Sequence, residues 1–190
     1  PVHDEKIKKT AIEGTNNILD SIPQKCKIIF PSTHVISEGL NKTKNNIDEN
    51  EDPCPILAYS SSKAQNEQDI KNSNKNYIIL RLGSVYGYST DTMRINIMPN
   101  LFSKIASQNG IINIFSGGNQ LKSLVAVFDV VRCMKFLGEN ERINKEIFNL
   151  VKDSVTVKEV AEICKKFNIK TSIKITDDEI PNLGYTLSNK

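Results

Sequence analysis

The sequence predicts an α/β protein in which helices cover both faces of a doubly wound parallel β-sheet. Residues 25–30, 76–82 and 146–151 are short apolar runs that suit buried strands. Run 25–30 follows segment 4–20, and run 76–82 follows segment 58–71; we predict both segments to be helices. Strands that are apolar throughout and separated by helices are typical of parallel sheets buried on both faces. Ligands bind at the carboxyl ends of such strands, so a site is expected there.

Each further element is predicted from a local signal. Pro31 ends the first strand, and Asn109-Gly110 is a good stop for a helix over 96–108. Asp129 is placed to cap a helix that runs to about residue 137, because its carboxylate can accept the free amides of the first turn. The remaining predicted elements are strands at 111–115 and 124–128 around a turn at 116–120, a helix over 155–167 that begins at Ser154 or Thr156, and a strand at 172–175.

Three segments have neither a strand nor a helix signal. They are residues 38–55, residues 83–92 and the tail beyond Asp177. The first of these is rich in asparagine and too long for a plain connector, and loops of that length are usually functional or disordered. The Gly117-Gly118 pair in the turn at 116–120 suits either a hairpin turn or a phosphate cradle.

Composition and charge describe a globular chain. Its 190 residues suffice for one domain, or for a domain with a small lobe. The net charge of +3 comes from scattered lysines rather than from a basic stripe, which argues against nucleic-acid binding. No apolar run approaches the roughly 20 residues of a membrane span. The four widely spaced cysteines favour free thiols in a reducing cytosol, hence a cytoplasmic protein, and no residues have the spacing of a metal site.

Tyr59 and Lys63 form the first candidate site. Four residues apart on a helix, their side chains project from one face, and an ammonium near a phenol favours the phenolate. A tyrosine with a lowered pKa can act as a general acid or base at a hydroxyl or carbonyl carbon. The spacing alone is a weak signal, because a packed tyrosine and a solvated lysine on an amphipathic helix give the same pattern.

Hydroxyl side chains follow two of the predicted strands. Ser32 and Thr33 come at the end of the first strand, and Ser84 comes just after the second. Because the carboxyl ends of parallel strands meet at one edge of a sheet, we expect Ser32 or Thr33 to lie near Tyr59 and to hydrogen-bond the same substrate oxygen. A strand-end hydroxyl, a Tyr-x-x-x-Lys helix and a strand-end loop, in that order, are far more specific than any one of them.

In this order the motifs resemble those of the extended short-chain dehydrogenase/reductases, and among them the NAD-dependent epimerase/dehydratases of nucleotide sugars. The resemblance runs through most of the chain. Its motifs are Gly-Thr-x-x-Ile-Leu at 14–19, Phe-Pro-Ser-Thr at 30–33, Tyr-x-x-x-Lys at 59–63 with Ser62 and Glu67, Arg-Leu-Gly-Ser-Val-Tyr-Gly at 81–87, Phe-Ser-Gly-Gly-Asn-Gln at 115–120, Val-Phe-Asp-Val-Val at 127–131, Phe-Asn-Leu at 148–150 and Thr-Val-Lys-Glu-Val at 156–160.

The resemblance implies three groups of site residues and no metal. The implied catalytic residues are Tyr59, Lys63 and Thr33; those implied to bind NAD (or NADP) are Ser32, Tyr59, Lys63 and Tyr86; those implied to bind the nucleotide sugar are Ser84, Lys122 and Asn119. The residues themselves leave other roles open. Ser32 suits a structural hydrogen bond, Tyr86 a packed aromatic side chain, and Ser84 and Lys122 suit solvated surface positions.

The implied activity is oxidation of a nucleotide-linked sugar followed by a second step. Tyr59 would remove a hydroxyl proton as a hydride leaves the ring carbon for NAD, with Lys63 holding the tyrosine ionised and Thr33 polarising the oxygen. Rotation and re-reduction then give epimerisation, whereas elimination gives dehydration. His34 and Val35 follow Thr33 where an acidic residue would help elimination, which favours an epimerase or a reductase. His34 also fits a proton relay, although a lone histidine needs no role.

Some family features do not occur in the sequence. The Gly-x-x-Gly-x-x-Gly turn that takes the dinucleotide pyrophosphate is absent, as is the acidic residue for the adenine ribose. Lys122 stands where an arginine often binds the diphosphate, and lysine cannot make the two-pronged contact. The resemblance therefore implies the C-terminal part of a Rossmann-like domain with a small α/β substrate-binding lobe.

We expect residues 1–93 to form the catalytic part, about 94–128 and 152–190 to form the lobe, and 129–151 to return to the sheet. The alternative is a non-catalytic fragment or degenerate homologue that binds a nucleotide sugar or a partner subunit. An incomplete sheet exposes an apolar edge, which favours association, so a homodimer also stays open.

Overall fold

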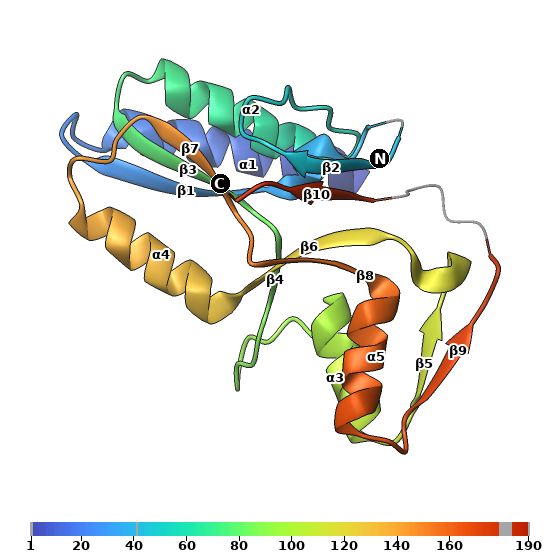
Figure 1. The fold of residues 1–190 in the computed structure, drawn as a ribbon. Helices are drawn as coiled ribbons and strands as arrows, with labels where there is room; N and C mark the ends of the chain where they lie inside the picture. Colours follow the sequence, from blue (N-terminus) through green and yellow to red (C-terminus); the bar gives the residue numbers. More distant parts are fainter. Residues whose placement is uncertain (1, 41, 179–183, 190) are drawn as a thin grey trace.

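A three-stranded parallel sheet, with helices on both faces, lies beside a smaller lobe in the computed structural model, which describes residues 2–40, 42–178 and 184–189 (Figure 1). The helices are α1 (Val2–Ser21), α2 (Ala58–Asn72), α3 (Met98–Ser107), α4 (Val127–Glu139) and α5 (Val157–Phe167), with short 3-10 helices η1 (His34–Ser37) and η2 (Ser116–Gly118). The strands are β1 (Lys27–Thr33), β2 (Lys44–Ile47), β3 (Asn76–Leu82), β4 (Ser84–Tyr86), β5 (Ile111–Ile114), β6 (Leu121–Ala126), β7 (Glu146–Leu150), β8 (Asp153–Thr156), β9 (Ser172–Ile175) and β10 (Tyr185–Leu187).

The central sheet has the order β1-β3-β7, and both pairs are parallel. Its middle strand, β3, sends alternate side chains to opposite faces. Tyr77 and Ile79 pack on the side of α1 and α2, where Leu19 and Ile70 meet them. Ile78 and Leu80 pack with Leu137 of α4 on the other side. Figure 1 shows α1 and α2 on one face and α4 on the opposite face, so the predicted parallel sheet with two covered faces is confirmed.

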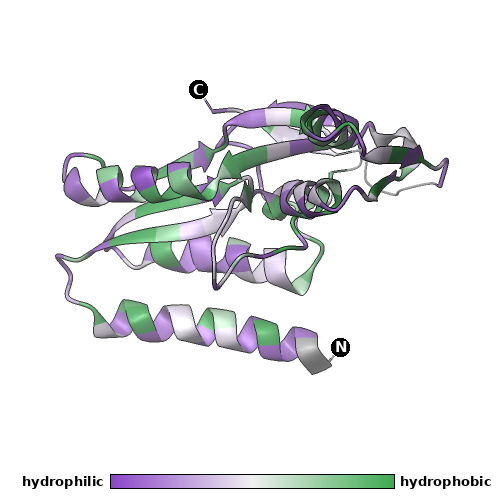
Figure 2. Cartoon of the chain, turned by 90° about the horizontal axis from the view of Figure 1, so that it is seen from below, coloured by the Kyte–Doolittle hydropathy of each residue, from purple (hydrophilic) through white to green (hydrophobic). Residues whose placement is uncertain are grey.

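Burial of β3 accounts for much of the stability of this part. Ile78, Ile79 and Leu80 are fully buried, and burying one such side chain contributes about 1.5–3 kcal/mol. Figure 2 shows the hydrophobic colouring of the sheet beside helices such as α1, whose residues alternate between hydrophobic and hydrophilic. On the sheet side α1 buries Leu19 and α2 buries Ile70, while most other residues of α1 are exposed.

The first strand is longer than predicted. β1 continues through Pro31 to Thr33, and Pro31 stands opposite Leu80 in the parallel register. In the described part of the chain β1 pairs with β3 alone, and an edge strand tolerates proline because one side of its backbone needs no ladder hydrogen bonds. The prediction that Pro31 ends the strand is therefore wrong, and the extension carries Ser32 and Thr33 within the sheet.

Four short strands occur where none was predicted: β2 and β10, which pair with each other, and β4 and β8, which both pair with β6. β2 lies in the asparagine-rich segment 38–55 and β10 in the tail beyond Asp177, of which residues 179–183 and 190 lie outside the described residues. Asn46 N–H donates to Thr186 Oγ1 at 3.0 Å, and Ile47, Tyr185 and Leu187 share a small core. β2 and β10 could not be predicted from the sequence, because each is stabilised by a partner strand about 140 residues away rather than by a local apolar pattern.

Two further expectations near residues 116–129 need correction. β5 and β6 do not form a hairpin, because β5 pairs with β9, while β6 pairs with β4 and β8. The turn between them is η2, in which Gly117 and Gly118 have φ values of 66° and 74°. Asp129 does not cap α4: the cap position is Ala126, without a side-chain hydrogen bond, and Asp129 lies in the first turn as an ion-pair partner of Arg132 at 3.5 Å.

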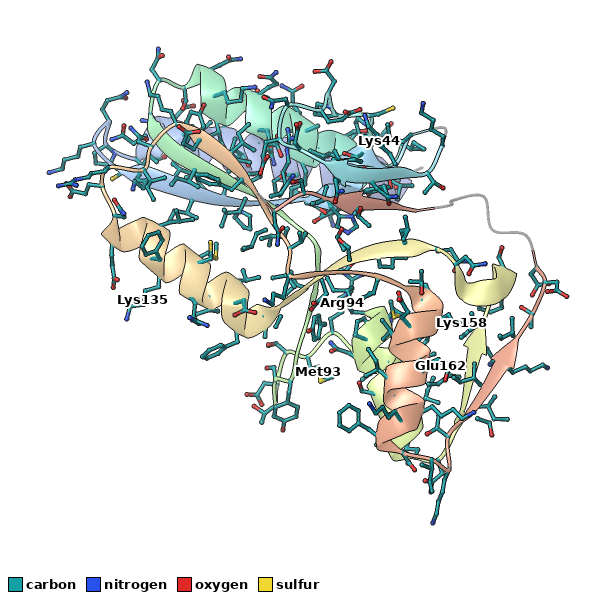
Figure 3. The ribbon with its side chains drawn as sticks, viewed as in Figure 1. Lys44, Met93, Arg94, Lys135, Lys158 and Glu162 are labelled. Carbon is teal, nitrogen blue, oxygen red and sulfur yellow. The ribbon has the colours of Figure 1, made fainter. Side chains whose placement is uncertain are left out.

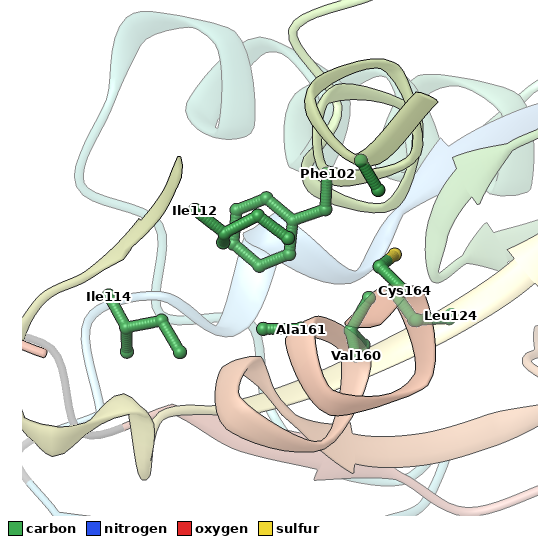
Figure 4. Close-up of a cluster of buried hydrophobic side chains, with 8 residues drawn as sticks. Phe102, Ile112, Ile114, Leu124, Val160, Ala161 and Cys164 are labelled. Atoms are coloured by element: carbon green, nitrogen blue, oxygen red, sulfur yellow. The ribbon is translucent and has the colours of Figure 1, made fainter. Parts of the chain in front are cut away.

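The lobe has a core of its own, drawn in Figure 4. It lies where α3 and α5 pack on the β5–β9 pair, and its buried members are Phe102, Ala106, Ile112, Ile114, Leu124, Val160, Ala161 and Cys164. Thr156 begins α5, as one of the two predicted starts: its hydroxyl accepts the Glu159 N–H, and Glu159 in turn accepts the Thr156 N–H, a capping box.

Candidate functional site

A cleft of about 730 Å³ lies at the carboxyl ends of β1 and β3, between the sheet and the loop that leads from β4 to α3. This is the edge at which parallel α/β sheets bind ligands. Five of the residues implied by sequence line it: Ser32, Thr33, Tyr59, Ser84 and Tyr86. They come from three different elements, β1, α2 and β4, so the fold itself brings them together.

Thr33 offers a hydroxyl to the cleft at the last position of β1. Its Oγ1 accepts the N–H of Val35 at 3.2 Å, which caps the following 3-10 helix and fixes the rotamer of the side chain. A threonine that accepts in this way still has its own O–H to donate. Thr33 can therefore donate a hydrogen bond to a ligand oxygen without losing its structural bond.

Ser32 is committed to a buried network. Its hydroxyl donates to Glu67 Oε1 at 2.5 Å, and Glu67 Oε2 forms an ion pair with Arg81 Nη2 at 2.9 Å. Both charged side chains are more than 90% buried. Arg81 also donates to the carbonyl of Glu49 at 3.0 Å, which anchors the segment before α2. The network fixes the end of β1 against α2, and this favours the structural role for Ser32.

Tyr59 and Lys63 stand one turn apart on α2 but have different surroundings. Tyr59 lines the cleft and is 47% exposed, so a ligand can reach its hydroxyl. Lys63 Nζ donates to the carbonyl of Pro31 at 2.8 Å and lies 4.5 Å from the centre of the Phe30 ring. Burial lowers the pKa of Lys63, and the nearby Glu67 carboxylate opposes that shift. Lys63 is thus held on the backbone of β1, beside the cleft rather than in its lining.

Ser84 meets His34 inside the cleft. Ser84 Oγ lies 3.3 Å from His34 Nε2, and His34 Nδ1 is buried with no hydrogen-bond partner among the described residues. Burial, and then the positive charge of Lys122, lower the pKa of His34 to about 4, although Glu38 opposes them. His34 is therefore neutral at pH 7, which gives it little use as a proton donor in a relay.

Tyr86 lines the same cleft from β4. Burial raises the pKa of its hydroxyl, and the carboxylates of Asp153 and Asp129 add to the shift. Tyr86 consequently remains a neutral hydrogen-bonding group at physiological pH. Its side chain also packs against the lobe core, so it joins the cleft to the lobe.

Lys122 and Asn119 lie outside the lining of the cleft. Lys122 is half-buried on β6, where burial lowers its pKa. Its positive charge in turn lowers the pKa of His34. Asn119 is exposed at the end of η2. The described residues contain no cluster of His, Cys, Asp or Glu that could hold a metal, and none of the described helices is long and apolar enough to cross a bilayer.

Arg94 and Asn100 are among the lining residues of the cleft that were not predicted from the sequence. They line it from the loop before α3 and from α3 itself. Neither has a motif or a periodic position that singles it out. For Asn100 the sequence gives one indirect signal, because it is a polar residue on the apolar face of an amphipathic helix.

The fold and the cleft describe an α/β protein with a cleft at the carboxyl ends of its parallel strands, lined by Tyr59 of the Tyr-x-x-x-Lys helix and by the strand-end Thr33. A model of the NAD dependent epimerase/dehydratase family matches residues 2–150. The chain belongs to this family.

Individual relatives agree with the assignment. The chain is 30% identical over 175 residues to the "Putative UDP-glucose 4-epimerase" of Methanocaldococcus jannaschii, an alignment that covers 82% of this chain and 55% of that protein. The fold resembles UDP-glucose 4-epimerase of Thermotoga maritima with UDP-glucose (TM-score 0.83, 22% identity, 98% of this chain and 62% of that one). It also resembles dTDP-glucose 4,6-dehydratase of Bacillus anthracis in complex with NAD (TM-score 0.79, 18% identity, 96% and 60%). The chain thus spans 55–62% of the length of these relatives.

Proposed function

We propose that this chain carries the catalytic and sugar-binding residues of an NAD-dependent enzyme that epimerises a nucleotide-linked sugar. The observation that carries the proposal is the meeting of Thr33, Tyr59 and Ser84 on one cleft, at the strand ends where family members are expected to react. A phenol and two aliphatic hydroxyls facing one space suit a ligand that is itself rich in hydroxyls.

The residues beside β1 fit the nicotinamide end of NAD. Lys63 uses one of its three N–H donors on Pro31 and keeps two for a ribose hydroxyl, while the phenol of Tyr59 stands exposed in the adjoining cleft. Tyr59, Lys63 and Tyr86 are the residues that we assign to this end of the cofactor, while Ser32 holds the end of β1 through its hydrogen bond to Glu67. When bound, NAD supplies the hydride acceptor and donor.

Tyr59 and Thr33 would act on the same sugar oxygen. Tyr59 removes the proton of the hydroxyl at the reacting carbon, and Thr33 donates its O–H to that oxygen as it becomes a carbonyl. The positive charge of Lys63 lies one helical turn from Tyr59. In the reverse direction Tyr59 returns the proton to the same oxygen.

The charge of the cleft favours epimerisation over dehydration. Elimination needs an acid that protonates the leaving hydroxyl. Among the described residues that line the cleft there is no aspartate or glutamate, and His34, next to Thr33, is neutral at pH 7. Removal and return of a hydride and a proton need no such acid.

Tyr59→Phe tests the mechanism. In the presence of NAD and a nucleotide sugar such as UDP-glucose, we expect kcat to fall by about 10²- to 10⁴-fold, the usual contribution of a general acid–base group. Tyr77→Phe is the matched control, because Tyr77 is buried at the far end of β3, away from the cleft.

Full activity of Tyr59→Phe would contradict the assignment of Tyr59. Binding of the nucleotide sugar without turnover, under every cofactor condition, would favour the alternative of a non-catalytic binding chain. A rise in the thermal midpoint on addition of each ligand measures binding separately from turnover.

A further inference from the structure

We propose that Arg94 binds an anionic group of the substrate in the cleft. The inference rests on the proposed function, because it takes the ligand to be a sugar linked to a nucleoside diphosphate. It concerns a residue that has no place in the motifs of the sequence.

The charge of the cleft is the first observation. Arg94 is the only lysine or arginine among the described residues that line it, and no aspartate or glutamate accompanies it. The rest of the lining consists of hydroxyl, aromatic, aliphatic, amide and glycine residues, together with the neutral His34. A space with one positive charge and no negative charge attracts anions.

The guanidinium of Arg94 also forms no ion pair with the described residues. Arg94 is exposed, and Arg81 and Arg132, by contrast, do form ion pairs. Figure 3 labels Arg94 on the loop between β4 and α3, close to where the sheet part and the lobe meet. Its planar set of N–H donors is therefore available to a ligand.

The backbone on which Arg94 stands is held in place. Asn100, buried at the start of α3, accepts the Gly87 N–H at 3.0 Å through Oδ1 and donates through Nδ2 to the Arg94 carbonyl at 3.1 Å. One side chain thereby holds both the start of the loop and Arg94 against α3. The Arg94 carbonyl also accepts the N–H of Ile97 at 3.4 Å. Arg94 is thus mounted on a fixed backbone, which lowers the entropic cost of binding.

Guanidinium groups bind phosphate and carboxylate with two parallel hydrogen bonds, which lysine cannot do. The family resemblance implied contact with the diphosphate for Lys122, but Arg94 lines the cleft and Lys122 does not. Two anionic groups share this chemistry: the diphosphate, which every nucleotide sugar carries, and a carboxylate on the sugar ring.

Titration calorimetry of the 190-residue chain with UDP-glucose and with UDP-glucuronate tests the inference. We expect Arg94→Gln to raise the Kd by about 10- to 100-fold, corresponding to loss of a charge-assisted hydrogen bond. Arg94→Lys should recover part of the affinity, and the dependence of Kd on salt should flatten in Arg94→Gln. Arg142→Gln, an exposed arginine between α4 and β7, is the control that should leave Kd unchanged.

The two ligands separate the two sources of the anion. An equal loss for both assigns Arg94 to the diphosphate, and a loss confined to UDP-glucuronate assigns it to a sugar carboxylate. Unchanged affinity of Arg94→Gln for both ligands overturns the inference and leaves the proposed function standing. Binding that depends on Arg94 without turnover overturns the proposed function and leaves the inference standing, and failure of the wild-type chain to bind either ligand overturns both.

Discussion

His34 shows how strongly a single buried side chain can depend on its neighbours. The ring is enclosed beside Ser84, it faces the ammonium of Lys122 and the carboxylate of Glu38, and it stacks in a tilted contact on Tyr185 at 5.6 Å. Burial and Lys122 both oppose protonation, so the folded-state pKa lies near 4 against an unperturbed value of 6.5.

This residue should make the protein sensitive to acid. Because the pKa of His34 is lower in the folded state, its contribution to stability is fully present above pH 6.5 and is lost as the pH falls toward 4. The loss amounts to about 2–3 kcal/mol. In urea unfolding measured from pH 7.5 to 4, His34→Gln should flatten this part of the curve. An equal slope in wild type and variant would show that other groups cause it.

Residues at strand ends could be predicted from the sequence, and residues on irregular loops could not. Ser32, Thr33 and Ser84 follow apolar runs, so their meeting follows from the parallel sheet alone. Arg94 stands in a loop without periodicity, and its place depends on a hydrogen bond to Asn100 that no local pattern announces.

At the scale of elements, a buried ion pair joins β1, α2 and β3. Glu67 of α2 accepts hydrogen bonds from Ser32 of β1 and from Arg81 of β3, and Arg81 is its buried ion-pair partner. Such a pair adds little net stability compared with apolar residues, yet removing one partner leaves a buried charge alone.

Arg81→Met should therefore destabilise the protein by about 3–5 kcal/mol, because Glu67 remains buried without its ion-pair partner. The double variant Arg81→Met/Glu67→Leu should recover a large part of that loss. Chemical denaturation of the two single variants and the double variant gives the coupling energy. Additive effects of the two substitutions would contradict the role of the pair.

The elements predicted well are those with enough residues to repeat a pattern. The helices and the strands β1, β3 and β7 are long or apolar enough to show their period. β4 and β8 have three and four residues and exist because they pair with β6, which is a tertiary effect. The prediction that Asp129 caps α4 was wrong because capping depends on the geometry of one residue at the helix boundary, and predicted boundaries are uncertain by a few residues.

At the scale of the whole molecule, the sheet part and the lobe have separate hydrophobic cores. Ile78, Leu80 and Leu137 belong to one, whereas Phe102 and Ala161 belong to the other. The cleft lies between the two parts, so movement of the lobe relative to the sheet would change its width. Separate cores allow such movement without loss of packing in either part.

Phe102→Ala should reveal this division. Loss of the ring from the lobe core should cost about 3–5 kcal/mol locally. In native-state hydrogen exchange, amide protection should fall in α3, α5 and β5 and stay nearly unchanged in β1 and β3. A uniform fall across the chain would show that the two cores unfold as one unit.

The pairing of β2 with β10 has a consequence for synthesis. Tyr185 donates its hydroxyl to the backbone carbonyl of His34 at 2.9 Å, and the Leu187 N–H donates to Ser123 Oγ at 2.9 Å. Contacts this distant in sequence form late, because the chain must first close a long loop. On the ribosome the backbone of His34, the residue after Thr33, therefore lacks its hydrogen bond from Tyr185 until that tyrosine has emerged, however early β1 has folded.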